Sequence, residues 1–173
     1  MKKFIISYSL TGNNRAVAKA LAEKIGANLI QVSEKKKRSK GKILIDTFLK
    51  RTPEINLSSF DICDEDFVIL NAPIWLGQVA APMRSIFEIV RKGNFKYAFI
   101  SLSGGADGPD SNDKISEELE ARIGRKPEYV LDLHKADLLP AKPQPTREMT
   151  MNYQITKKDL DILMAKATPI ITG

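Results

Sequence analysis

The stretch that decides the fold is FIISYSLTGNN, residues 4–14. It opens with a short apolar run, which is typical of a strand buried on both faces of a sheet, and it closes with a turn. After the turn, Val17, Leu21 and Ile25 recur at four-residue spacing, which predicts a helix that ends at Gly26. A strand, a loop and a helix in this order form the unit from which parallel sheets are built.

The same unit recurs along the rest of the chain. Further strands are predicted at Leu29–Val32, Phe67–Leu70, Tyr97–Ile100 and Tyr129–Leu133. Helices are predicted at Ile43–Leu49, after Pro82, at Ile115–Ile123 and from Thr156 onward. This alternation predicts an α/β fold with a doubly wound, five-stranded parallel sheet, for which we expect the strand order 2-1-3-4-5.

Length and composition limit the function classes. With 173 residues the chain fits a single domain, 1–173. Its one cysteine, Cys63, cannot form an internal disulfide and suits a reducing cytoplasm, while its one histidine, His134, argues against a His-rich metal site. We interpret both residues as structural or incidental and expect no bound metal. No apolar run approaches the roughly 18 residues of a membrane span.

The net charge of +6 comes from one segment, Lys35–Lys42, which holds six basic residues and no acidic one. Outside it, 27 − 6 = 21 basic residues balance 21 acidic residues. A solvated surface loop is the simpler interpretation, and a contact for an acidic protein partner is the alternative. Because the excess charge is confined to one loop, the sequence does not favour a nucleic-acid partner.

The first loop has the features of an anion site. In open α/β sheets, ligands bind beyond the carboxyl ends of the strands where the strand order reverses, here between the first and third strands. Gly12 permits a tight turn, and the N–H groups and dipole of the following helix favour negative charge. Side chains of Ser9, Thr11 and Asn14 would donate hydrogen bonds to a phosphate without help from lysine or arginine. The alternative is a plain turn with a helix cap.

Two further loops leave neighbouring strands of the predicted sheet. Trp75, the only tryptophan, follows the third strand and offers a stacking platform for an aromatic ring, while Gly77 allows a close backbone approach. The alternative is a core tryptophan beneath the next helix. The glycine-rich loop that begins at Ser101 follows the fourth strand and can line the opposite wall.

Together these loops resemble those of the flavodoxin-like family of flavin mononucleotide (FMN) proteins. The S-x-T-G-N pattern at residues 9–13 is similar to the family's phosphate loop, although Asn14 stands where threonine is usual. The P-x-W-x-G pattern at residues 73–77 is similar to the region after the third strand, and Ser103-Gly104-Gly105 resembles the third loop of the family's oxidoreductases. The resemblance implies FMN bound by Ser9, Leu10, Thr11, Gly12, Asn13, Asn14, Ala72, Pro73, Ile74, Trp75, Leu76, Gly77, Ser103, Gly104, Gly105 and Asp107.

The implied activity is redox chemistry carried by the flavin, with no catalytic side chain required. Electron carriers of the family are usually acidic, whereas this chain is basic. We therefore expect a flavoprotein that reduces small acceptors such as quinones with a nicotinamide donor. The alternatives are a carrier that serves a specific protein and a non-enzymatic binding module on the same scaffold. The proline-containing segment 140–155 is expected to cover a site, pack on a partner or do neither.

Overall fold

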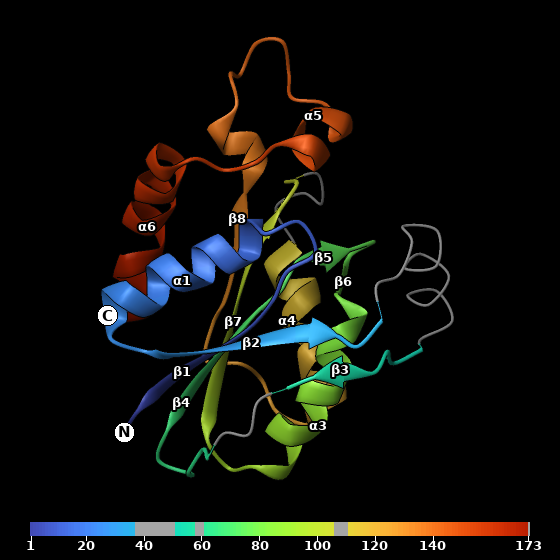
Figure 1. The fold of residues 1–173 in the computed structure, drawn as a ribbon, viewed down its shortest axis with the longest axis vertical. Helices are drawn as coiled ribbons and strands as arrows, with labels where there is room; N and C mark the ends of the chain where they lie inside the picture. Colours follow the sequence, from blue (N-terminus) through green and yellow to red (C-terminus); the bar gives the residue numbers. More distant parts are fainter. Residues whose placement is uncertain (37–50, 58–60, 106–110, 173) are drawn as a thin grey trace.

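The computed structural model describes residues 1–36, 51–57, 61–105 and 111–172. It shows a central sheet with helices packed against both faces (Figure 1). The helix predicted at Ile43–Leu49, most of the basic segment and Asp107 lie outside the described residues.

Within the described part of the chain, the main sheet has six strands in the order β3-β2-β1-β4-β7-β8. They are β1 (Lys3–Tyr8), β2 (Asn28–Glu34), β3 (Ile55–Asn56), β4 (Phe67–Asn71), β7 (Lys96–Ser103) and β8 (Val130–His134). All neighbours pair in parallel except β3, which pairs antiparallel with the end of β2. The prediction of a five-stranded, wholly parallel sheet was therefore wrong. The sixth strand is only two residues long, too short to show a periodic pattern.

Two pairs of helices cover the two faces (Figure 1). One face is covered by α1 (Asn13–Ile25) and α6 (Lys157–Thr172), the other by α3 (Arg84–Lys92) and α4 (Ser111–Ile123). The remaining elements are the hairpin β5 (Ile74–Trp75) and β6 (Gln78–Val79), the short helices η1 (Ala81–Met83) and η2 (Lys135–Leu138), and α5 (Arg147–Asn152).

The core lies on both sides of the sheet because successive side chains of a strand point to opposite faces. In β1, the buried Ile5 packs in one cluster with Leu21 of α1. Its neighbour Ile6 packs in the other cluster with Phe87 of α3 and Leu119 of α4. The near-continuous apolar run of β1 therefore follows from its central position, and the strands form a rigid base for the loops at their ends.

The helix predicted from Thr156 onward begins with a capping box. The Asp159 N–H donates to Oγ1 of Thr156 at 3.3 Å, and the Thr156 N–H donates to Oδ2 of Asp159 at 2.7 Å. This reciprocal pair satisfies two amides that the first turn of a helix leaves without partners.

Candidate functional site

Three loops meet at one edge of the sheet. The pairs β1–β4 and β4–β7 are parallel, so the carboxyl ends of these strands share an edge. In Figure 1 this edge holds the N-terminal end of α1, the β5–β6 hairpin and, above them, α5. The structure thus brings together the first loop (residues 9–12), the second loop (72–77) and the third loop (103–105), each predicted as part of the site.

The first loop leads into an uncapped helix. Gly12 is the N-cap of α1, with φ 96° and ψ −21°, and among the described residues no side chain caps this end. The Gly12 N–H donates to Oγ of Ser9 at 3.0 Å, which tightens the turn. The first turn of α1 contains no acidic residue. The N–H groups of residues 13–15 have no carbonyl within the helix to bond, because the helix begins too close before them. These free N–H groups and the helix dipole favour an anion at this end.

The side chain of Asn14 links two elements of the fold. Asn14 is 3% exposed, and its Oδ1 accepts the Leu102 N–H at 2.8 Å while its Nδ2 donates to the Leu102 carbonyl at 3.1 Å. Both ends of the amide therefore tie α1 to β7. One hydrogen of the Asn14 Nδ2 group is thus used within the fold, and the expected donation from this side chain to a phosphate, which the second hydrogen would supply, stays a prediction.

Asn13 forms a similar clamp with a distant segment. Its Nδ2 donates to the Tyr153 carbonyl at 2.7 Å, and its Oδ1 accepts the Ile155 N–H at 3.2 Å. We call residues 146–155, which comprise α5 and the residues around it, the strap. The clamp fastens the strap to the first turn of α1.

The strap also packs on the third loop. A Cβ placed on Gly104 would lie 3.2 Å from Oγ1 of Thr150, a buried residue of α5. The contact leaves little room for a side chain at position 104. The second part of segment 140–155 thus packs against the first turn of α1 and against the third loop.

Removal of the Asn13 clamp is expected to loosen the strap. In Asn13→Ala, the Tyr153 carbonyl and the Ile155 N–H lose their partner, so trypsin should cleave faster after the exposed Arg147. Asn152→Ala, which changes an exposed asparagine of the same segment, is the control. Equal cleavage rates for both variants and the wild type would show that the clamp does not hold the strap.

The second loop is a tight hairpin. Its two turn residues, Leu76 and Gly77, have φ values of 52° and 74°, as a type I′ turn requires. The positive φ costs a glycine little, but Leu76 is strained, and its apolar side chain is 59% exposed. Strained residues cluster at functional sites, which makes this turn a candidate ligand contact.

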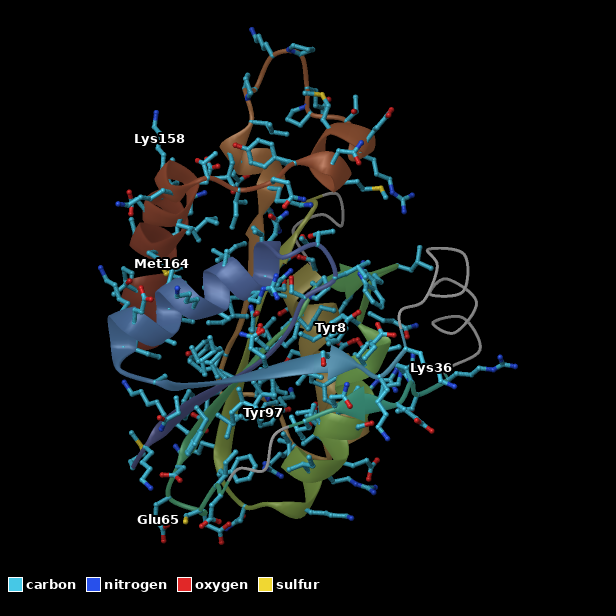
Figure 2. All side chains as sticks on the ribbon, in the orientation of Figure 1. Tyr8, Lys36, Glu65, Tyr97, Lys158 and Met164 are labelled. Carbon is cyan, nitrogen blue, oxygen red and sulfur yellow. The ribbon has the colours of Figure 1, made fainter. Side chains whose placement is uncertain are left out.

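Trp75 rests on a buried tyrosine. Its ring meets the Tyr8 ring edge to face, with centroids 5.9 Å apart and an interplanar angle of 84°. The Tyr8 hydroxyl donates to Oε1 of Glu34 at 2.5 Å, and Figure 2 shows the Tyr8 side chain inside the molecule. Trp75 itself is half-buried, so its indole is supported by the core without being enclosed by it.

A carboxylate on α4 holds the hairpin in place. Oε2 of Glu118 accepts the Val79 N–H of β6 at 2.8 Å, and its Oε1 lies 2.7 Å from Nε of Arg122. Because the carboxylate is also fixed by the arginine, its position and that of β6 are coupled. The position of the Trp75 turn thus depends on α4, which lies some forty residues further along the chain.

The third loop is closely packed against the end of β8. Gly105 has φ 87°, and a Cβ there would lie 2.9 Å from Cβ of His134. The Gly105 N–H donates to Oγ of Ser103 at 3.1 Å. Both the backbone conformation and the close contact require glycine at this position.

A buried carboxylate lies behind this loop. Oδ2 of Asp132 accepts the Ser103 hydroxyl at 2.7 Å, and its Oδ1 accepts the Ser101 hydroxyl. Nε2 of His134 lies 3.3 Å from the same Oδ2. This hydrogen bond to Asp132 raises the pKa of the His134 imidazole, against the opposing effect of burial. The sequence interpretation of His134 as structural missed this pair.

Arg15 was also missed. Its guanidinium nitrogen lies 3.8 Å from the position that a Cβ of Gly12 would take, and the residue is exposed. An exposed cation thus lies beside this loop, and the expectation that the loop holds a phosphate without lysine or arginine stays a prediction. A cation at this end opposes the helix dipole, and a bound anion would relieve that repulsion.

Other features lie away from these loops. A hollow of about 410 Å3 lies beside β2 and β3, and another of about 540 Å3 lies between α1 and α6. In the basic segment, Lys35 pairs with Glu54 at 3.6 Å and Lys36 points away from the molecule (Figure 2). Among the described residues there is no cluster of potential metal ligands. None of the helices in the described part of the chain has the length and apolarity to cross a bilayer.

No protein family model matches the sequence, and no curated protein matches it. Solved structures do. A flavoprotein from Lactobacillus acidophilus, in complex with FMN, has a TM-score of 0.64 and 20% identity over 76% of this chain and 92% of its own. The apo form of the same protein has a TM-score of 0.61 and 20% identity, over 79% of this chain and 94% of its own. A candidate flavoprotein from Bacteroides eggerthii has a TM-score of 0.60 and 13% identity, over 95% of this chain and 96% of its own.

At these identities the likeness concerns the fold, and it agrees with the reversal of strand order between β1 and β4. The chain therefore has the flavodoxin-like α/β fold that these flavoproteins share.

Proposed function

We propose that this protein binds FMN and works in electron transfer. The observation that carries the proposal is the uncapped N-terminus of α1, which follows the Gly12 turn where the strand order reverses. A phosphate monoester fits this end, because the amides of residues 13–15 and the Arg15 guanidinium supply donors and positive charge. The FMN complex of the Lactobacillus protein, which has the same fold, supports this choice of cofactor.

The second and third loops fit a flat ring system. The strained Leu76 turn and the half-buried Trp75 offer apolar surface, and the glycines at 104 and 105 allow close approach of the main chain. Bound flavin would supply the redox chemistry, accepting electrons from one partner and passing them to another. The chain's own residues bind and orient the cofactor and exclude water from it.

The finer proposal is a reductase of small acceptors such as quinones that uses a nicotinamide donor. The net charge of +6 supports it over an acidic type of electron carrier. A carrier that docks on an acidic partner through residues 35–42 is the second candidate. The two differ in one test: reduced nicotinamide alone should bleach the flavin of a reductase under anaerobic conditions, and it should leave a carrier oxidised.

A fluorescence titration with FMN tests cofactor binding. Because Trp75 is the only tryptophan, saturable quenching of its emission, together with a change in the flavin visible spectrum, is expected on binding. The control is Trp75→Phe, which should keep the visible change and lose the emission signal. A wild-type protein in which neither signal moves would contradict the assignment, and salt-sensitive binding to polyanions would then favour the binding module.

A further inference from the structure

The third loop is supported from behind by a chain of hydrogen bonds. The Gly105 N–H donates to Oγ of Ser103, and the Ser103 hydroxyl donates to Oδ2 of Asp132. Nε2 of His134 lies 3.3 Å from that same carboxylate oxygen. The path thus runs from the imidazole to a main-chain amide that the proposed function places beside the cofactor.

The burial of these groups makes the charge of His134 important. The side chain of Asp132 is only 1% exposed, whereas that of His134 is 30% exposed. A protonated imidazole neutralises the buried carboxylate, and a neutral imidazole leaves its charge uncompensated behind the loop. The protonation of one partly accessible group therefore changes the net charge at this wall.

We propose that Asp132 and His134 form a proton-dependent support for the third loop and that they make FMN affinity depend on the charge of His134. This inference rests on the proposed function. Because FMN carries a negatively charged phosphate, an uncompensated carboxylate at this wall opposes its binding. Affinity is expected to be higher at low pH and to fall severalfold as the pH rises through the titration of His134, with a fraction of a proton taken up on binding within that range.

Among the residues that the structure describes, two charged groups besides Asp132 act on the imidazole. Asp137 of η2 also favours its charged form, while Lys166 of α6, which lies 2.9 Å from Asp137, opposes it. Lys135 is buried next to His134, and burial lowers the pKa of its ammonium group. These groups stay unchanged when only His134 is replaced, so such a variant isolates the contribution of the imidazole.

The pair should also link stability to pH. The pKa of His134 in the folded protein is raised above its ordinary value of 6.5. The stabilisation from the pair is therefore fully present below about pH 6.5 and is lost as the pH rises through the folded-state pKa. Urea unfolding across this range should show that loss in the wild type and not in His134→Gln.

The first test needs no cofactor. His134 is the only histidine, so its ring protons can be followed by proton NMR during a pH titration of the FMN-free protein. The wild type should titrate above the ordinary value, and Asp132→Asn, which keeps the shape of the carboxylate without its charge, should titrate lower. Identical titrations in the two proteins would overturn the pairing.

The second test measures the FMN dissociation constant of the wild type and of His134→Gln from pH 5.5 to 8.5. FMN phosphate titrates near pH 6, and this contribution is common to both proteins. The inference expects a steeper loss of affinity with pH in the wild type. Parallel profiles would overturn the inference and leave the proposed function standing, while a wild type that binds no FMN at any pH would overturn both. Circular dichroism of the variant checks that it is folded.

Discussion

Replacing Asn14 by aspartate is expected to lower the free energy of unfolding by about 3–5 kcal/mol at pH 7. The Asn14 amide is 3% exposed and uses its oxygen and its nitrogen on the main chain of Leu102. In Asn14→Asp, a carboxylate oxygen would face the Leu102 carbonyl, so a buried charge would meet another acceptor. Burial would raise the pKa of the new carboxyl, and part of the lost stability should return as the pH falls and the group gains a proton to donate.

Urea unfolding of Asn14→Asp and Asn13→Asp at pH 7 and pH 5 measures this effect. Asn13 is the matched control, because it is an adjacent asparagine of the same 3% exposure whose clamp holds only the strap. Its replacement should cost less, about 1–2 kcal/mol, since release of the strap lets water reach the freed groups. An equal loss of unfolding free energy in the two variants would show that the Asn14 link between α1 and β7 stabilises the fold no more than the Asn13 clamp does.

The two asparagines show where sequence reasoning reached its limit. The apolar run of β1, the helix after it and the glycine between them are local patterns, and the structure has them where they were expected. An asparagine beside a glycine is equally compatible with a cap, a ligand or a clamp. For Asn14, the main chain of Leu102 makes the residue a clamp. Leu102 lies 88 residues away in the sequence, so no local pattern around Asn14 could indicate this contact.

The pair behind the third loop, in contrast, left a signal in the sequence. Ser101 and Ser103 are two residues apart in β7, and Asp132 and His134 are two residues apart in β8, so each pair shares one face of its strand. The structure pairs Ser101 with Asp132 and Ser103 with His134 in register. Polar residues at this spacing in two neighbouring strands indicate a contact between the strands, and the signal appears only when the two strands are compared.

The short elements had weaker signals. The strand β3 and the hairpin strands have two residues each, which is below the length at which alternation can be recognised. The turn at Leu76 lacks the usual Asn-Gly or Asp-Gly pair, so only Gly77 marked it. Such elements depend on contacts with the rest of the fold, as the bond from Glu118 to β6 illustrates.

A methyl group on Gly12 is expected to weaken FMN binding about tenfold, which corresponds to about 1.4 kcal/mol. Gly12 has φ 96°, a left-handed conformation that costs residues with a side chain about 1–2 kcal/mol. Gly12→Ala can relieve this strain only by moving the first turn of α1. The amides of residues 13–15 would then point away from the phosphate, and binding would have to restore the strained backbone.

The other end of the same helix supplies the control. Gly26 also has a positive φ, 65°, and nothing lies within 4 Å of a Cβ placed there. Gly26→Ala should therefore lower stability to a similar extent while leaving FMN affinity at the wild-type value. Flavin titrations and urea unfolding of both variants separate strain from binding. Only Gly12 lies at the proposed site, so an equal loss of affinity in both variants would contradict the proposal that this turn holds the phosphate. Wild-type affinity for FMN in Gly12→Ala would contradict it as well.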